Sequence, residues 1–274
     1  MASPPITKKA PDSLLNWLEL VEDREPSYPQ FNLSDFYEKY DLSADVEKKI
    51  IDGLSSSLIH PIVLEELEKR GWKKTRDKLM SFRKPKYVTL KRGDFGETLL
   101  LLLLLEHFQY IIPVVKLRFR VTKGQSLPGT DLVAIKLSDG KLIEFCYVES
   151  KLRTYLDYGI GAEGYLQLQK DYNENIPAIL IFILNVLAER KDPLLHVLLD
   201  YLRRRDDIHG VDRFILGLTL DSTSFSESVL KNICDCENIG NYPRCIVTVV
   251  KLNELRTKID YFYGKIGATA EDEN

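Results

Sequence analysis

The segment from Pro128 to Arg153 constrains the fold of this chain more than any other. It contains two runs rich in β-branched and aromatic residues, separated by Ser-Asp-Gly at 138–140, a pattern typical of a β-hairpin. Charged residues stand at the ends of these runs: Asp131 opens the first strand, and Glu149 and Lys151 close the second. Carboxylates at the end of a buried strand need a positive partner. The pattern therefore predicts a divalent-cation site at this end of the hairpin.

The register of the hairpin decides whether these groups can meet. Side chains alternate between faces along a strand, so Glu149 and Lys151 share a face. A two-residue turn would put Asp131 on the opposite face. A three-residue turn, with Gly140 in the left-handed conformation, shifts the register by one residue and sets Asp131 against Tyr147. This register also pairs apolar residues along the hairpin, so we expect it; a β-bulge would have the same effect.

The residue types point to hydrolysis of phosphodiester bonds. Asp131 and Glu149 would hold the cation through hard oxygen ligands, with water and a backbone carbonyl, such as that of Ser150, completing the shell. All-oxygen ligation favours Mg²⁺ or Mn²⁺ over zinc. Lys151 would position or deprotonate the attacking water, or neutralise charge in the transition state. The alternatives are an exposed ion pair between Glu149 and Lys151, and a simple turn acid at Asp131.

The remaining pattern predicts an α/β fold, with a mixed central β-sheet flanked by helices. Residues 91–274 are expected to form one domain, in which a loop containing Gly93 and Gly96 leads into a buried helix over the seven leucines at 99–105. Further strands are expected at 117–121, 213–220 and 245–252, and further helices at 165–172, 176–187, 193–205, 226–236 and 253–266. Residues 1–90 are expected to be mostly helical, with helices at 13–22, 46–54 and 61–70 and N-caps at Ser34 and Ser43.

A strongly basic stretch covers residues 69–92. It holds eleven Lys or Arg and a single acid, Asp77, in a chain whose net charge is −3. Such asymmetry is a common feature of nucleic-acid-binding surfaces. Trp72, Phe82 and Tyr87 are interleaved with the charges and could stack on bases. The alternative is a solvated helix and loop. The candidate contacts in this stretch are Lys73, Lys74, Arg76, Arg83, Lys84, Lys86 and Arg92.

The order of these features resembles the PD-(D/E)xK nuclease superfamily. Over about residues 91–175, a helix with Glu97 precedes a strand with Asp131, and a strand with Glu-Ser-Lys at 149–151 follows. The aspartate here follows Pro-Gly-Thr instead of a direct proline. The sequences Arg-Gly-Asp-Phe-Gly-Glu at 92–97 and Glu-Ser-Lys-Leu-Arg at 149–153 are also similar to those of HamA, the nuclease subunit family of bacterial Hachiman anti-phage systems.

This resemblance implies a nuclease core, a mostly helical amino-terminal region, a helicase partner (HamB) and action on phage DNA. It implies that Glu97 orients a metal-bound water or Lys151; alternatively, Glu97 is an acid placed to suit a helix dipole. It also implies phosphate or active-site contacts on the helix after the motif, for which Gln167, Gln169 and Lys170 are the candidates; the alternative is a solvated helix face. Arg153, at the end of the second hairpin strand, could also contact phosphate.

Composition narrows the functional class. Four cysteines in 274 residues are too few for a disulfide framework, and no secretory leader pattern is found, so we expect a cytoplasmic protein. No Gly-rich phosphate loop with lysine occurs, so we expect no ATP hydrolysis in this chain. The expected function is a Mg²⁺-dependent deoxyribonuclease. The alternatives are a non-catalytic module that binds nucleic acid or protein, and a sequence-specific restriction nuclease.

Overall fold

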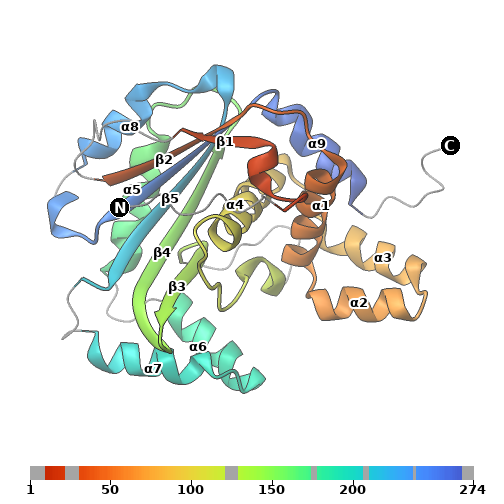
Figure 1. Ribbon diagram of the computed structural model, residues 1–274, viewed down its shortest axis with the longest axis horizontal. Helices are drawn as coiled ribbons and strands as arrows, with labels where there is room; N and C mark the ends of the chain where they lie inside the picture. The colour runs from red at the N-terminus through yellow and green to blue at the C-terminus, as the bar shows by residue number, and fades with distance from the viewer. Residues whose placement is uncertain are drawn as a thin grey trace.

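A six-stranded mixed β-sheet forms the centre of the protein in the computed structural model (Figure 1), in the order β1-β2-β6-β5-β4-β3. The structure describes residues 10–21, 31–120, 129–173, 178–205, 210–236 and 239–266. The strands are β1 (Leu18–Val21), β2 (Phe31–Glu38), β3 (Leu132–Ser138), β4 (Lys141–Arg153), β5 (Asp212–Asp221) and β6 (Cys245–Leu252). The expected mixed sheet flanked by helices is confirmed.

Four parallel strands make up the interior of the sheet. β2, β6, β5 and β4 run parallel, whereas β1 and β3 pair antiparallel with their neighbours at the two edges. Parallel strands are covered on both faces and therefore have nearly continuous apolar sequences, as in the run Ile246–Val250 of β6. This arrangement buries β4 and places β3 at the edge, where Asp131 precedes it.

The β3–β4 hairpin forms with a different register from the expected one. Ser138 pairs with Lys141 across a two-residue turn in which Asp139 and Gly140 both have positive φ, so the three-residue turn was wrong. The register then shifts by one residue between Lys136 and Leu137. Beyond this irregularity β3 and β4 pair so that the residue before Leu132 comes level with Glu149. This one-residue shift puts Asp131 and Glu149 on the same face of the hairpin. A β-bulge was the alternative to the three-residue turn, and it has this effect.

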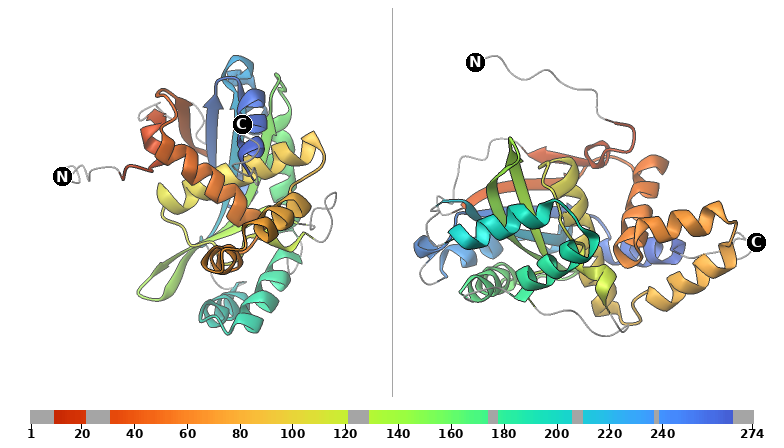
Figure 2. Two further views of the ribbon diagram at one scale, coloured as in Figure 1. Left: turned by 90° about the vertical axis from the view of Figure 1, so that its right-hand side faces the viewer. Right: turned by 90° about the horizontal axis from the view of Figure 1, so that it is seen from below.

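Helices cover both faces of the sheet (Figures 1 and 2). On one face lie α1 (Ala44–Leu58), α4 (Val88–Glu106) and α9 (Leu255–Lys265), in an apolar core with Phe36, Leu152 and Val250. On the other lie α5 (Ile160–Tyr172), α6 (Ala178–Arg190), α7 (Leu194–Arg204) and α8 (Glu227–Cys234), packed on Phe145 and Phe214. α2 (Pro61–Lys69) and α3 (Lys73–Arg83) project from the side of the body in Figure 1.

Several expected helices are confirmed. The helix expected at 176–187 is found as α6 from Ala178 onward, and residues 176 and 177 lie outside the described residues. The helices expected at 193–205, 226–236 and 253–266 also form, with ends that differ by a few residues. Ser43 caps α1, since its Oγ accepts a hydrogen bond from the Val46 amide. Pro61 begins α2, where its missing N–H costs nothing. The helix expected at 165–172 begins earlier, at Ile160.

The glycines before the leucine run do not form a loop. α4 begins at Val88, so both Gly93 and Gly96 lie inside it. A Cβ on Gly96 would lie 3.1 Å from Ser150 Oγ and 3.3 Å from Leu152 Cβ. The glycine therefore allows α4 to pack directly against the end of β4, which brings Glu97 to the site. No helix among the described residues is long and apolar enough to cross a membrane.

Three expectations about the other elements were wrong. The helix expected at 13–22 is a short 3₁₀ turn (Leu14–Asn16) followed by β1, and Ser34 lies within β2 instead of capping a helix. The strand expected at 117–121 is a 3₁₀ helix over Lys116–Phe119; Val121 lies outside the described residues. β1 and β2 complete the sheet, so the described residues before α4 pack in the same core as α9 and β6.

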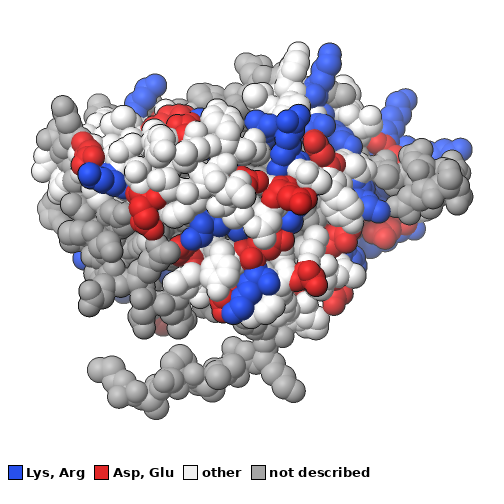
Figure 3. All heavy atoms as spheres, turned by 90° about the horizontal axis from the view of Figure 1, so that it is seen from above, with Lys and Arg blue, Asp and Glu red and all other residues white. Residues whose placement is uncertain are grey.

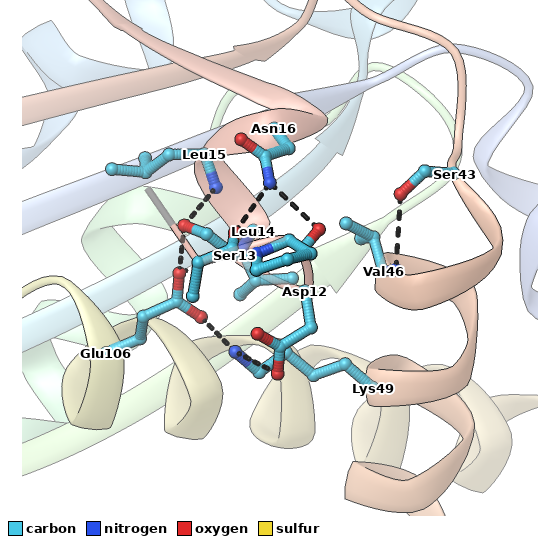
Figure 4. A network of polar contacts seen from close by, with 11 residues as sticks. Asp12, Ser13, Leu14, Leu15, Asn16, Ser43, Val46, Lys49 and Glu106 are labelled. Carbon is cyan, nitrogen blue, oxygen red and sulfur yellow. Dashed lines mark hydrogen bonds and ion pairs between the residues drawn. The ribbon is translucent and has the colours of Figure 1, made fainter. Parts of the chain in front are cut away.

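Polar contacts attach the amino-terminal segment to the body (Figure 4). Glu106, at the end of α4, accepts hydrogen bonds from the Ser13 hydroxyl and the Leu14 amide. Lys49 of α1 lies 2.6 Å from Glu106 Oε2 and 3.3 Å from Asp12 Oδ2. A carboxylate at the negative end of a helix needs such partners, and Glu106 thereby joins α1, α4 and the first turn.

Candidate active site

Asp131, Glu149 and Lys151 come together where β4 extends beyond the end of β3. Pairing between the two strands ends at Leu132 and Val148, which leaves the next residues of β4 without a strand neighbour on that side. Asp131 takes the place of the missing strand, because its Oδ2 accepts a hydrogen bond of 2.8 Å from the Ser150 amide. The carboxylate of Asp131 is thereby fixed beside the Glu-Ser-Lys segment.

Glu149 is a buried carboxyl group with an unusually high proton affinity. Its side chain is 7% exposed. Burial raises the pKa of Glu149 to about 8, with a further contribution from the nearby charge of Asp131 and opposition from Lys151. Burial also raises the pKa of Asp131, although Lys116 and the Ser150 amide oppose the change. Two neighbouring acids whose ionised forms are both disfavoured by burial are suited to sharing a cation.

Lys151 lies against Glu149 and stays protonated. Its Nζ is 3.1 Å from Glu149 Oε1 and 2.9 Å from Glu163 Oε1, on α5. Burial lowers the pKa of Lys151, but the two carboxylates outweigh this effect and the net change is upward. The lysine can therefore supply positive charge and donate hydrogen bonds, and it is poorly suited to accept a proton in this environment.

Glu97 reaches the site from the other face of the sheet. It is buried in α4, and its Oε2 has no hydrogen-bond partner within the described part of the chain. Burial raises the pKa of Glu97 well above its ordinary value, and Asp131 and Asp94 raise it further. A buried, unsatisfied carboxylate oxygen is costly, and a cation or an ordered water beside Asp131 would satisfy it.

Two buried cations at the site were missed from the sequence. Lys116 is only 5% exposed, and its Nζ donates to the carbonyl oxygens of Gly129 and Thr130, at 2.9 and 2.8 Å, which fixes the backbone leading into Asp131. It also opposes the rise in the pKa of Asp131. Nothing in the local pattern singles out one lysine between Val115 and Leu117.

Arg120 forms the second buried cation. It makes a two-pronged contact with Asp94, at 2.8 and 2.6 Å, with both side chains at most 5% exposed. Asp94 lies three residues before Glu97, on the same side of α4. Asp94 belongs to the Arg-Gly-Asp-Phe-Gly-Glu segment, and this motif is the sequence feature from which the Asp94–Arg120 pair could have been suspected.

The donor set fits a hard cation held in part by water. No group of three or more His, Cys, Asp or Glu close enough to form a metal site occurs among the residues that the structure describes. Asp131 and Glu149, the two candidate carboxylates, therefore do not form a three-ligand site with Glu97, and water would supply the remaining ligands. Mg²⁺ keeps several waters and commonly takes only one or two carboxylates, so this set suits Mg²⁺ or Mn²⁺ and offers no thiolate or imidazole for zinc.

The remaining candidates include Gln167 and Lys170 on α5 and Arg153 at the end of β4, and their surroundings differ. Gln167 donates to Asp171 Oδ1 at 3.0 Å, and Asp171 in turn raises the pKa of Asp131, so this part of α5 faces the site. Lys170 is exposed. Arg153 lies 3.0 Å from both Asp157 and Glu163. The arginine is thus beside Lys151, where a phosphate could reach both.

The basic stretch divides into exposed and structural residues. Lys73, Lys74 and Lys86 are exposed, and Arg76 and Arg92 are partly exposed. Trp72, Phe82 and Tyr87 are all more than half exposed. Thr75, Lys78, Leu79, Ser81 and Phe82 line a surface hollow of about 470 Å³ on α3. This region keeps the combination of charge and aromatic surface that nucleic-acid binding requires.

Arg83 and Lys84 serve the fold instead. Arg83 donates to the carbonyl oxygens of Leu58, Leu117 and Arg118 at 2.9 to 3.0 Å, and also to that of Arg120. Burial lowers the pKa of Lys84, whose Nζ lies 3.4 Å from the Ile266 carbonyl oxygen. Both were expected to contact nucleic acid, but both side chains form contacts within the protein.

The face of the molecule seen from above in Figure 3 carries positive and negative side chains next to one another.

Comparison with known proteins adds one finding. A family model described as HamA matches residues 12–266, which include every strand of the sheet and all the candidate residues at the end of β4. No curated protein gives a significant match to the chain.

Proposed function

The chain belongs to the HamA family, and from this premise we propose that it is a metal-dependent nuclease that acts on DNA in anti-phage defence. The family match accords with a defence role. The observation that carries the enzymatic proposal is the convergence of Asp131, Glu149 and Lys151 at the open end of β4, with Glu97 beside them. The arrangement accords with the PD-(D/E)xK resemblance.

Each residue has a distinct role in this proposal. Asp131 and Glu149 would hold the cation, which when bound would lower the pKa of a coordinated water and polarise the scissile phosphate. Asp131 is kept in place by the Ser150 amide and by Lys116, which fixes the preceding carbonyls. Lys151 remains charged and stabilises the negative charge that builds up on the phosphate oxygens. Glu97, whose Oε2 has no hydrogen-bond partner among the described residues, would orient a water molecule beside Asp131.

The exposed side of α3 supplies a surface for DNA. Lys73, Lys74 and Lys86 would neutralise phosphates, and Trp72 and Phe82 offer faces for stacking. Outside residues 69–92 the chain carries 27 Lys or Arg and 40 Asp or Glu, so the remainder has a net charge of −13 and repels DNA. A partner that delivers DNA would compensate for this repulsion. We propose a HamB-like helicase for that role, on the basis of the family and of the lack of a phosphate-binding loop in this chain.

Plasmid cleavage tests the enzymatic proposal. Wild type is expected to nick or degrade DNA with Mg²⁺ or Mn²⁺ and to be inactive with chelator, whereas Glu149→Gln and Lys151→Met are inactive under all conditions. Glu144→Gln is the matched control: it lies on the same strand but contacts the Tyr110 hydroxyl at 2.7 Å, away from the site. It should cleave like wild type. Cleavage that survives in Glu149→Gln would contradict the proposal.

Two further outcomes separate the alternatives. A restriction nuclease would give discrete fragments instead of nicks or general degradation. A non-catalytic binding module would show no cleavage in any buffer and would lose DNA binding only on charge reversal at Lys73 and Lys74. Co-purification with a helicase from the native host tests the partner.

A further inference from the structure

Glu163 of α5 bridges the two cations that a substrate phosphate would need. Its Oε1 lies 2.9 Å from Lys151 Nζ, and its Oε2 lies 3.0 Å from Arg153 Nη2. Lys151 and Arg153 are two residues apart on β4 and so project from the same face. One carboxylate with an oxygen on each cation resembles a phosphodiester, which likewise shares a single negative charge between two oxygens.

The exposure of these groups shows which of them substrate meets first. The Glu163 side chain is 52% exposed, whereas Lys151 is 17% and Arg153 is 26% exposed. The carboxylate therefore lies over the two cations on the solvent side. A phosphate that approaches Lys151 has to displace it, which requires only rotation of a long side chain and no movement of the backbone.

The packing of α5 fixes this contact. A Cβ on Gly164 would lie 2.5 Å from Leu216 Cδ1 and 3.2 Å from Lys151 Cγ. Only a glycine allows α5 to approach β4 and β5 this closely, and the neighbouring Glu163 is then held above Lys151. Arg153 is restrained from the other side by Asp157, at 3.0 Å.

We propose that Glu163 is a built-in competitor for substrate phosphate, which occupies Lys151 and Arg153 until nucleic acid displaces it. The inference rests on the proposed function and deepens it, since it assigns the phosphate subsite to these two cations. It also predicts that Glu163 slows cleavage by the chain alone, because each encounter with DNA has to break two ion pairs before the phosphate can bind.

Direct binding tests the inference without requiring cleavage. The anisotropy of a fluorescently labelled DNA oligonucleotide is measured in EDTA for wild type and Glu163→Gln, which keeps the side-chain volume and removes the charge. Two partly exposed ion pairs correspond to a gain in affinity of about three- to tenfold. The gain should shrink when Arg153→Gln is combined with Glu163→Gln, because one of the freed cations is then absent.

Asp200→Asn is the matched control. Asp200 is also a partly exposed carboxylate that bridges two cations, Arg203 and Arg204, but it lies on α7. Its substitution should leave DNA affinity unchanged. Equal affinities for wild type, Glu163→Gln and Asp200→Asn would overturn the inference, as would loss of Mg²⁺-dependent cleavage in Glu163→Gln without tighter binding. Absence of cleavage by wild type would instead overturn the nuclease proposal. Tighter DNA binding by Glu163→Gln would in that case still support Glu163 as a competitor for phosphate.

Discussion

Removing the carboxylate of Glu149 should stabilise the protein at alkaline pH while it abolishes the proposed activity. Below pH 4.5 both folded and unfolded chains keep this group protonated. Between pH 4.5 and about 8 only the folded chain retains the proton, so the free energy of unfolding falls as the pH rises, and above about 8 the loss is complete. A change in pKa from 4.5 to about 8 corresponds to about 5 kcal/mol.

Glutamine recovers part of this free energy, because it has the shape of glutamate without its charge. The gain is smaller than the full amount, since Lys151 loses the anionic partner that lies 3.1 Å away. We expect Glu149→Gln to be about 2–3 kcal/mol more stable than wild type at pH 9, which is about 5–10 °C in melting temperature for a chain of this size. At pH 5, where wild type carries the proton, the two should melt together.

Thermal melts in EDTA at pH 5 and pH 9 measure this difference. Glu144→Gln, on the same strand, should change the free energy of unfolding by less than about 0.5 kcal/mol at either pH. These expectations depend on folding disfavouring the ionised form of Glu149. That premise would be refuted by a Glu149→Gln variant that melts at a lower temperature than wild type at pH 9, or whose melting temperature rises equally at both pH values.

Three more predictions concern the network, the DNA surface and the pH dependence of cleavage. Arg120→Met should destabilise the fold by about 3–5 kcal/mol in chemical denaturation, because Asp94 is left buried without its partner, whereas Arg203→Met on an exposed pair should cost less than about 1 kcal/mol. Lys73→Glu combined with Lys74→Glu should weaken DNA binding and reduce the slope of log Kd against log salt by about 2; an unchanged slope would exclude them as phosphate contacts. The pH of half-maximal cleavage should lie near 8 at low Mg²⁺ and fall as Mg²⁺ is raised, since the cation competes with the proton on Glu149; a midpoint independent of Mg²⁺ would contradict this.

The hairpin shows what local sequence can and cannot determine. Apolar pairing and the alternation of side chains predict that Asp131 and Glu149 share a face, and the structure brings the two together. The expected pairs were wrong, however: Ile135 pairs with Phe145, and Asp131 comes level with Glu149 instead of Tyr147. The turn itself was wrong, because Asp139 and Gly140 readily adopt positive φ and close a two-residue turn. The one-residue shift between Lys136 and Leu137 then corrects the face. Such a bulge leaves no distinctive mark in the sequence, since it depends on packing against both faces of the sheet.

The missed strands and cations depend on partners far along the chain. β2 pairs along most of its length with β6, more than 200 residues later, and its nearer partner β1 has only four residues, so local sequence gives little sign of the strand at 31–38. The alternating sequence at 117–121 suggested a strand, yet these residues turn because Lys116 binds the carbonyls before Asp131 and Arg83 binds the carbonyls that follow Lys116. Buried charges of this kind are satisfied by tertiary contacts, and periodicity does not detect them.

Calorimetric titration of Mn²⁺ into the apo protein tests the central claim most directly. We predict about one Mn²⁺ per chain in wild type at pH 8, released by EDTA, and no saturable binding in Asp131→Asn or Glu149→Gln, with Glu144→Gln unaffected. Absence of Mn²⁺ binding by wild type, or binding that persists unchanged in both Asp131→Asn and Glu149→Gln, would contradict the assignment of these two carboxylates to a metal site.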